Sequence, residues 1–236
     1  MDITGSIALV TGANRGFGLR LTDALLDRGA AKVYAAARNP DSVPAREGVI
    51  PVRLDVTDAA SVAAAAELAT DLTLLVNNAG SSTGADLLSA PLAAIRTEMD
   101  THFFGTLEVT RAFAPLIERN GGGAILNVLS ALSWVSFPQV GAYCAAKSAE
   151  WSLTNALRVQ LAPAITVSGL HVGFMDTDMA ASVTSPKADP RIVAERALDG
   201  VTGGAFEILA DDTAEQVKAG LSGPLAGFYP QLVATG

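Results

Sequence analysis

Short apolar runs alternate with longer segments of helical period along this chain, and this alternation limits the possible folds more than any other feature. It is typical of a parallel sheet with helices on both faces. Several runs are almost wholly apolar, as expected for strands buried on both sides. The sequence therefore predicts an α/β fold with a doubly wound parallel sheet of about seven strands. The predicted strands are Ile7–Thr11, Lys32–Ala37, Val49–Leu54, Leu72–Asn77, Gly123–Leu129, Ile165–His171 and Phe206–Ala210.

The segments between these strands have the apolar spacing of amphipathic helices. Gly29 and Pro163 mark the ends of the first and fourth helices, because glycine readily ends a helix and proline cannot continue one. The pair Thr57-Asp58 offers a capping side chain to the second helix. The predicted helices are Gly18–Arg28, Ser61–Leu68, Leu92–Arg119, Tyr143–Leu161, Pro190–Asp199 and Thr213–Leu221.

One stretch, Ala180–Asp189, has little periodicity and several small or polar residues. Loops of this kind late in an α/β enzyme often close over a substrate, so residues 178–190 are a candidate lid. An ordinary surface connection explains the composition equally well. Because no repeat, linker or low-complexity tract interrupts the chain, residues 1–236 are expected to form a single domain.

Composition argues against several classes of function. The chain has 16 Lys and Arg against 24 Asp and Glu, and this net charge of −8 would repel a nucleic-acid backbone. No apolar run approaches the about 18 residues of a membrane span, and no signal peptide is expected. The single cysteine, Cys144, cannot form an internal disulfide, which favours a cytoplasmic location. One Cys and two His are too few for a Cys/His zinc site, and no metal is expected.

A glycine-rich turn, Thr11-Gly12-Ala13-Asn14-Arg15-Gly16-Phe17-Gly18, joins the first predicted strand to the first helix. Glycine lets the backbone turn sharply and approach a pyrophosphate, whose charge is stabilised at a helix N-terminus. The glycines stand at positions 12, 16 and 18, which is not the spacing of the G-x-G-x-x-G dinucleotide pattern. A plain tight turn would explain them, but their place after the first strand of an alternating chain favours a dinucleotide site.

A second motif, Asn77-Asn78-Ala79-Gly80, ends the fourth predicted strand. In a doubly wound sheet, ligands bind where the strand order reverses, and the carboxyl ends of the first and fourth strands flank that crevice. Small residues and an amide there suit close approach to a ribose or an adenine. Taken alone, the motif is better explained as a plain turn.

Tyr143 and Lys147 lie four residues apart at the start of the predicted helix Tyr143–Leu161, so their side chains share a face of that helix. A free phenol has a pKa of about 10. A nearby ammonium favours the phenolate, as does a positively charged nicotinamide ring. Ser130 follows the fifth strand, where its hydroxyl can hydrogen-bond a substrate oxygen that gains negative charge. An isolated Tyr-Lys pair would be better explained as a solvated helix face.

Together and in this order, the turn Thr11–Gly18, the motif Asn77–Gly80 and the set Ser130, Tyr143 and Lys147 resemble the single-domain form of the short-chain dehydrogenase/reductase family. The resemblance runs from about residue 5 to residue 180. It implies a single-domain Rossmann fold, a nicotinamide cofactor, and oxidation of an alcohol or reduction of a carbonyl. It also implies that Tyr143 is the acid/base, that Lys147 binds the nicotinamide ribose and lowers the tyrosine pKa, and that Ser130 orients the substrate.

The chain departs from the family's pattern before the fifth strand. Gly105 fixes the register of the family's N-x-x-G motif, which places His102 where Asn is usual. The imidazole would hydrogen-bond a water that touches Lys147, or its ring would pack near Phe103 or Phe104; the two interpretations carry equal weight.

A second departure follows the sixth strand. Val172 replaces the proline of the family's P-G-x-x-x-T motif, whereas Gly173 and Thr177 fit it. The turn near the nicotinamide is therefore expected to be looser. Thr177 is expected to contact the carboxamide or a phosphate, with Met175 beside it.

Two arginines predict which cofactor is used. The second strand ends at Ala37-Arg38 with no acid to bond both ribose hydroxyls, and Arg15 stands in the glycine turn. Two guanidiniums there suit a 2′-phosphate, which favours NADP(H) over NAD(H), although they could be ordinary surface charges. By the family resemblance, Asp55 should contact the adenine. The expected cofactor contacts are Gly12, Asn14, Arg15, Gly16, Phe17, Gly18, Arg38, Asp55, Val56, Asn78, Ala79, Gly80, Tyr143, Lys147, Gly173, Met175 and Thr177.

These features favour an NADP(H)-dependent oxidoreductase that acts on a carbonyl or secondary alcohol of a small, largely apolar molecule. The expected catalytic set is Ser130, Tyr143, Lys147 and His102. The alternative is a non-catalytic NADP(H)-sensing or regulatory protein on the same fold, whose support is His102 and Val172. A halide-expelling relative is disfavoured, because the glycines and Lys147 are retained.

Apolar residues near the site would form a substrate pocket or, with equal weight, core and subunit contacts. They are Leu132, Trp134, Phe137, Met179 and Val183. Members of the family usually pair through two long helices, here Leu92–Arg119 and Tyr143–Leu161, so a homodimer or homotetramer is expected. The large apolar side chains proposed for that interface are Phe103, Phe104, Leu107, Phe113, Trp151 and Leu157.

Overall fold

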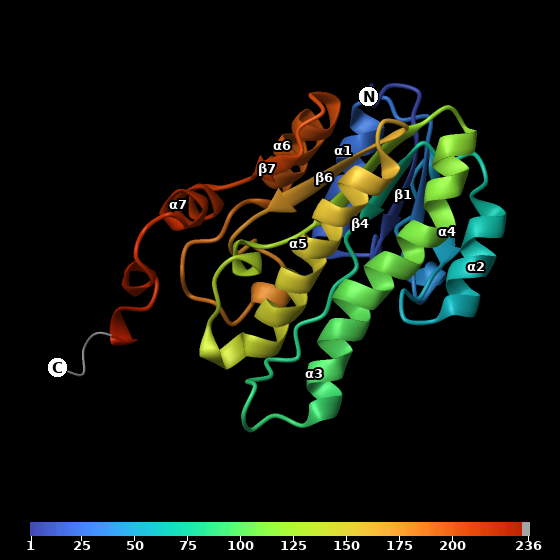
Figure 1. Cartoon of the computed structure of the whole chain (residues 1–236). Helices are drawn as coiled ribbons and strands as arrows, with labels where there is room; N and C mark the ends of the chain where they lie inside the picture. The colour runs from blue at the N-terminus through green and yellow to red at the C-terminus, as the bar shows by residue number, and fades with distance from the viewer. Residues whose placement is uncertain (233–236) are drawn as a thin grey trace.

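The computed structural model describes residues 1–232 as a seven-stranded sheet with helices on both faces (Figure 1). All neighbouring strands are parallel, in the order β3-β2-β1-β4-β5-β6-β7. The order reverses between β1 and β4, which confirms a doubly wound, Rossmann-type sheet. The strands are β1 (Ile7–Thr11), β2 (Lys32–Ala37), β3 (Val49–Arg53), β4 (Leu74–Asn77), β5 (Gly123–Val128), β6 (Ile165–His171) and β7 (Glu207–Leu209). The last four residues of the predicted domain, 233–236, lie outside the described residues.

Two apolar clusters attach the helices to the sheet. Ala8 and Val10 of β1 belong to the cluster beneath α1 and α6, whereas Leu9 belongs to the cluster beneath α2 and α4. This alternation follows from the two-residue period of a strand. The helices are α1 (Gly16–Asp27), α2 (Ala59–Leu68), α3 (Leu92–Met99), α4 (Thr106–Arg119), α5 (Gly141–Leu161), α6 (Pro190–Thr202) and α7 (Asp212–Gly220).

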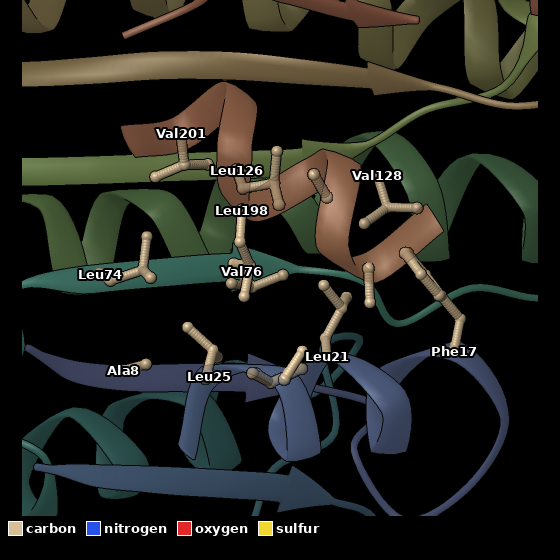
Figure 2. Close-up of a cluster of buried hydrophobic side chains, with 14 of the residues drawn as sticks. Ala8, Phe17, Leu21, Leu25, Leu74, Val76, Leu126, Val128, Leu198 and Val201 are labelled. Carbon is tan, nitrogen blue, oxygen red and sulfur yellow. The ribbon is translucent and has the colours of Figure 1, made fainter. Parts of the chain in front are cut away.

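Figure 2 shows how α1 is fixed against the sheet. Leu21 and Leu25 lie on one face of α1, four residues apart, and both are fully buried with Leu198 of α6. Phe17, at the first turn of α1, is buried in the same cluster. Burial of each such side chain stabilises the fold by about 1.5–3 kcal/mol. The cluster therefore fixes the N-terminus of α1, and with it the glycine turn.

The strand predictions are confirmed except at some ends. β4 begins at Leu74 rather than Leu72, although Leu72 is fully buried. Leu54 and Leu129 also lie just beyond β3 and β5 while remaining buried. An apolar run in the sequence indicates which residues are buried. Buried residues continue beyond the segment that forms hydrogen bonds to the neighbouring strands, so the predicted strands are longer than the observed ones. β7 excludes the predicted Phe206, whose side chain is exposed.

The helical run predicted over Leu92–Arg119 is present, but it is not one regular α-helix. A π-helical turn, Asp100–Gly105, separates α3 from α4. Apolar spacing does not reveal such a turn, because it widens the helix without ending it. Gly105 permits close packing here, since a Cβ on it would lie 2.9 Å from Val56 Cγ2. The turn also carries His102 into the interior.

Other helix boundaries differ by a few residues. α1 begins at Gly16 instead of Gly18, and α6 continues to Thr202. The predicted cap of α2 is confirmed, because Asp58 Oδ1 accepts a hydrogen bond from the Ala60 N–H at 3.0 Å. Within residues 1–232, no helix is both long enough and apolar enough to cross a membrane.

The side chains predicted for a subunit interface divide between core and surface. Phe113 and Leu157 are buried in the core, so the sequence prediction is wrong for these two. They lie on the inward faces of α4 and α5, which the helical pattern alone did not separate from the outer faces. Phe104 is 55% exposed, and the remaining three are partly exposed. The exposed residues leave an apolar surface on the π-helical turn.

Candidate active site

The glycine turn and the motif after β4 are joined by hydrogen bonds. The Thr11 hydroxyl accepts from the backbone N–H groups of Asn78 and Ala79, both at 2.9 Å. The Asn78 side chain donates to the Thr11 carbonyl oxygen at 2.8 Å. The two predicted motifs therefore lie side by side, at the point where the strand order reverses.

The shape of the glycine turn fits a pyrophosphate. Gly12 has a φ of +67°, which favours glycine, and a Cβ on Gly18 would overlap the Gly12 carbonyl oxygen. α1 begins at Gly16, and Arg15 at its N-cap position makes no side-chain capping hydrogen bond. The first N–H groups of this helix are therefore free to bind an external anion. Because the Phe17 side chain is buried in the core, only its backbone can serve a cofactor.

Two surface segments meet the glycine turn. Asn14 Nδ2 donates to Ser42 Oγ at 3.1 Å, which places the loop after β2 beside the turn. Arg15 Nη1 donates to Asp178 Oδ2 at 3.1 Å, and their side chains are 68% and 78% exposed. An ion pair this exposed contributes at most about 1 kcal/mol. Arg15 is therefore easily redirected to a stronger anion.

Arg38 lies exposed just after β2, near Asp55. Burial alone would raise the pKa of Asp55, but hydrogen bonds from Thr57 and the charges of Arg38 and Arg53 lower it below its ordinary value. Asp55 is therefore an ionised carboxylate just beyond the carboxyl end of β3, as Arg38 lies just beyond that of β2. The next residue, Val56, is partly buried against the π-helical turn.

Ser130 is held between two strands, just after β5. Its Oγ accepts from the Leu132 N–H at 3.1 Å and donates to the Val172 carbonyl oxygen at 3.5 Å. Its carbonyl oxygen accepts from His171 Nδ1 at 3.1 Å. The long bond to Val172 is weak, so the hydroxyl can turn to a substrate.

Tyr143 and Lys147 lie one turn apart near the start of α5, with Nζ 6.0 Å from the centre of the phenol ring. Lys147 is buried and Tyr143 is partly buried, so the pair does not form a solvated helix face. Burial raises the pKa of Tyr143, while the Lys147 ammonium and a hydrogen bond from Ser130 lower it. The net result lies above the ordinary value, with further contributions from two carboxylates.

Lys147 is fixed by two oxygen atoms. Its Nζ donates to the Val128 carbonyl oxygen and to Glu150 Oε2, both at 2.7 Å. Burial alone would lower the pKa of Lys147, but the Glu150 carboxylate raises it above the ordinary value. An ammonium has three N–H donors, so one remains for a ligand hydroxyl.

His102 lies between two buried carboxylates. Its Nε2 is 3.0 Å from the Ser81 carbonyl oxygen and 3.3 Å from Glu98 Oε2. Its Nδ1 is 3.9 Å from Glu150 Oε2. Burial would raise the pKa of Glu98, but hydrogen bonds from His102, Thr83 and Ser81 lower it to about 2. Glu98 is therefore ionised at every ordinary working pH.

The His102 ring packs edge-on against Tyr143, with ring centres 5.3 Å apart. Gly80 leaves room for it, since a Cβ there would lie 2.9 Å from His102 Cε1. Phe103 and Phe104 pack on each other, at 5.0 Å between ring centres. The structure therefore places His102 at the site rather than with these two rings. Its part in proton transfer stays a prediction.

The turn after β6 is anchored instead of loosened. The Gly173 N–H donates to Asp211 Oδ2 at 2.8 Å. The Val172 carbonyl oxygen accepts from the Ala131 N–H at 2.9 Å. The looser turn expected from the missing proline is therefore not observed, because the Asp211 carboxylate binds the backbone.

The rest of this loop returns to the glycine turn. Thr177 lies across from Gly16, whose added Cβ would be 3.9 Å from the threonine Cβ. Met175 packs against the core cluster under α1 and α6. The candidate lid begins with a 3₁₀ turn, Asp178–Ala180. Near its end, the Ala188 N–H donates to the Phe174 carbonyl oxygen at 2.8 Å.

Trp134 packs against His171, which favours the packing role over the pocket role that the sequence left equally open. Its ring stacks on His171, with ring centres 3.7 Å apart and an interplanar angle of 15°. Burial lowers the pKa of His171 to about 4, so the imidazole is neutral and stacks like an apolar ring. The other residues proposed for the pocket keep exposed surface: Leu132, Phe137, Met179 and Val183.

Comparison with known proteins identifies the family. A family model described as short chain dehydrogenase matches residues 6–188. The chain belongs to the short-chain dehydrogenase family. This agrees with the order of its motifs and with the geometry of Tyr143 and Lys147.

Two curated relatives of this short-chain dehydrogenase align with it over different shares of their length. An oxidoreductase of Bacillus subtilis strain 168 is 33% identical over 170 residues, 66% of this chain and 60% of that protein. Carbonyl reductase (NADPH) 2 of Sus scrofa is 31% identical over 201 residues, 83% of this chain and 82% of that protein. The chain therefore spans less than two thirds of the Bacillus protein.

Solved structures show the same fold. A short chain dehydrogenase from Burkholderia cenocepacia J2315 in complex with NADP has a TM-score of 0.94 and 39% identity, over 99% of this chain and 100% of that chain. A family member from Burkholderia phymatum in complex with NAD has a TM-score of 0.84 and 25% identity, over 98% and 96% of the two chains. Both cofactors thus occur among proteins of this fold.

Sequence analysis missed two residues at the site of this short-chain dehydrogenase. Glu150 stands three residues after Lys147, and Glu98 stands four residues before His102. Both spacings place the carboxylate on the same helical face as its partner. That spacing was the available signal, although only the structure shows that both carboxylates are buried.

Proposed function

We propose that this short-chain dehydrogenase is an NADP(H)-dependent oxidoreductase that acts on a carbonyl or secondary alcohol of a small, largely apolar molecule. The observation that carries the proposal is a buried, charged Lys147 beside Tyr143, at the sheet edge that also holds Ser130 and the glycine turn. The Sus scrofa relative is named as a carbonyl reductase that uses NADPH.

The chain's own residues supply orientation and a proton. In reduction, the Tyr143 hydroxyl gives its proton to the carbonyl oxygen as hydride reaches the carbonyl carbon; oxidation of an alcohol is the reverse. Ser130 donates a hydrogen bond to the substrate oxygen as its negative charge develops. The Lys147 ammonium stabilises the phenolate that remains. A bound nicotinamide cofactor supplies or accepts the hydride.

The residues near the carboxyl ends of β1 and β4, where the strand order reverses, fit that cofactor. The free N–H groups at the start of α1 would bind the pyrophosphate, and the close packing of Gly18 on the Gly12 carbonyl oxygen keeps the turn in shape. The third N–H of Lys147 would bind a nicotinamide ribose hydroxyl. Asp55 with Val56 would contact the adenine. The backbone and side chains proposed to complete the site are Asn14, Gly16, Phe17, Asn78, Ala79, Gly80, Gly173, Met175 and Thr177.

Arg15 and Arg38 support NADP(H) over NAD(H). The hydrogen bond from Asn14 to Ser42 shows that their two loops are neighbours. Both guanidiniums are exposed, so they can reach a 2′-phosphate. The Burkholderia cenocepacia relative, solved with NADP, supports this preference.

Steady-state rates with a panel of apolar ketones, aldehydes and secondary alcohols test the proposal. We expect turnover with a clear preference for NADPH. Arg38→Ala should lower kcat/KM for NADPH about 10- to 100-fold, because a hydrogen bond to a charged group contributes about 1.5–3 kcal/mol. The value for NADH should change little, and Arg111→Ala, exposed on α4, is the matched control. Equal preference, or unchanged preference in Arg38→Ala, contradicts the cofactor assignment.

We also propose a cytoplasmic location and a homodimer or homotetramer. The single cysteine, Cys144, is buried and reduced, which suits a reducing compartment. The exposed Phe104 on the π-helical turn supports association through the helices around it.

A further inference from the structure

Four ionisable side chains are buried together beside Tyr143. Glu98 and Glu150 are 0% and 1% exposed, His102 is 1% exposed and Lys147 is 5% exposed. Burial of a single charge is costly, so groups of this kind persist only when they are paired and hydrogen-bonded. The cluster therefore has to be understood as one unit.

Both carboxylate oxygens of Glu150 accept a hydrogen bond. Oε2 accepts from Lys147 Nζ at 2.7 Å, and Oε1 accepts from Thr106 Oγ1 at 2.9 Å. The carboxylate is thus fixed between α5, which carries it, and α4. It can hold the ammonium in one position with little freedom.

A second carboxylate stands on the far side of the imidazole. Glu98 accepts from the Ser81 hydroxyl at 2.9 Å and from the Thr83 N–H, and it lies 3.3 Å from His102 Nε2. The other ring nitrogen, Nδ1, is buried, has no hydrogen-bond partner among residues 1–232 and faces Glu150 Oε2 at 3.9 Å. His102 therefore separates the two carboxylates while contacting the Tyr143 ring.

We propose that Glu150 is a positioning residue that, together with Glu98 across His102, fixes Lys147 and keeps Tyr143 as a protonated phenol, the form that donates a proton to a carbonyl. The proposal rests on the proposed function, and it adds a positioning residue to it. A negative charge near a phenol disfavours the phenolate. Two such charges beside Tyr143 therefore extend to higher pH the range in which the phenol can donate a proton.

Every group around the phenol enters this balance. Lys147 and Glu150 face it from α5, Glu98 from α3, and Ser130 from the turn after β5, while His102 packs on its ring. Burial raises the pKa of Tyr143, and Lys147 and Ser130 lower it. Both carboxylates add to the effect of burial, which is the largest cause, and the pKa of Tyr143 lies above its ordinary value.

The test is the ionisation of Tyr143 in the cofactor-free protein. Tyrosinate absorbance is followed against pH, and the Tyr143→Phe difference removes the signals of the other two tyrosines. Glu150→Gln keeps the shape but removes the charge, and it should lower the Tyr143 midpoint by about one pH unit. The alkaline limit of carbonyl reduction should move to lower pH by the same amount.

Matched variants separate charge from packing. Thr106→Val removes a hydrogen bond to Glu150 but keeps its charge, so the midpoint should stay within a few tenths of a unit. Glu150→Asp should also keep it and restore part of the turnover. Glu207→Gln removes a carboxylate on β7 that lies 2.6 Å from Lys218 Nζ of α7, and it should leave the midpoint in place. If Glu150→Gln does not fold, Glu98→Gln must shift the midpoint in the same direction.

An unchanged or raised midpoint in Glu150→Gln overturns the proposal. So does a loss of turnover that is equal at every pH with the midpoint in place, because that assigns Glu150 a structural role only. A wild-type protein without activity on carbonyls or alcohols would instead remove the proposed function. The titration would still decide the role of Glu150, since it needs neither substrate nor cofactor.

Discussion

At the scale of single residues, His171 links the stability of the fold to pH. Its Nδ1 donates to the Ser130 carbonyl oxygen and its ring stacks on Trp134. Its Nε2 is buried and has no hydrogen-bond partner in the described part of the chain. Burial lowers the pKa of His171 to about 4 in the folded chain. An unfolded histidine has a pKa of about 6.5. Between these two values the unfolded chain binds a proton that the folded chain does not.

The stabilising contribution of the neutral His171 ring is therefore present above about pH 6.5 and is lost as the pH falls toward 4. We expect the free energy of unfolding to fall by on the order of 3 kcal/mol across this window. His171→Phe keeps a ring to stack on Trp134 but cannot titrate, so its pH dependence should be flatter. Urea unfolding at several pH values measures both proteins. Parallel curves would contradict the assignment.

Single residues also show how far the sequence leads. Ser130, Tyr143 and Lys147 were found because their order and spacing resemble the family's motif, and the structure brings Lys147 to 6.0 Å from the Tyr143 ring, while their catalytic roles stay predictions. Glu98 and Glu150 were not predicted, since carboxylates on helices are normally solvated. Their burial depends on hydrogen bonds from Thr106, Ser81 and Thr83, which come from distant parts of the chain.

At the scale of elements, the turn between β1 and α1 requires a residue without a Cβ at position 18. A Cβ there would overlap the Gly12 carbonyl oxygen and crowd the Asn78 side chain. Gly18→Ala should therefore destabilise the fold by about 1–3 kcal/mol and weaken NADPH binding. Gly227→Ala is the control, because a Cβ there meets no atom of residues 1–232 within 4 Å. Fluorescence titration with NADPH and urea unfolding report the two effects. Wild-type affinity in Gly18→Ala would contradict this account of the turn.

The elements themselves were largely predictable, with one exception that matters for the site. Strands β1, β2 and β6 have the bounds that their apolar runs indicate. The π-helical turn Asp100–Gly105 escaped prediction, because residues on both sides of it keep the apolar spacing of a helix. This turn carries His102 to Tyr143. The π-helical turn that positions His102 therefore lies inside the longest helical pattern of the sequence, Leu92–Arg119.

At the scale of the whole molecule, the exposed face of the π-helical turn and α5 predicts self-association. Phe104 is 55% exposed and Val159 is 80% exposed. We expect light scattering to give a mass at least twice the 24.1 kDa of one chain. Phe104→Glu should shift the population toward the monomer, whereas Leu88→Glu, in a fully exposed loop position, should not. A mass of one chain at micromolar concentration would refute the prediction.

The central claim is that Tyr143 transfers the proton in an NADP(H)-dependent oxidoreduction. Tyr143→Phe keeps the ring that packs against His102 and removes only the hydroxyl. General acid–base catalysis contributes roughly 100- to 10,000-fold to a rate. The most direct measurement is kcat for carbonyl reduction by this variant, together with its Kd for NADPH. The account predicts a fall in kcat within that range with the Kd nearly unchanged. A kcat near that of the wild type would contradict it.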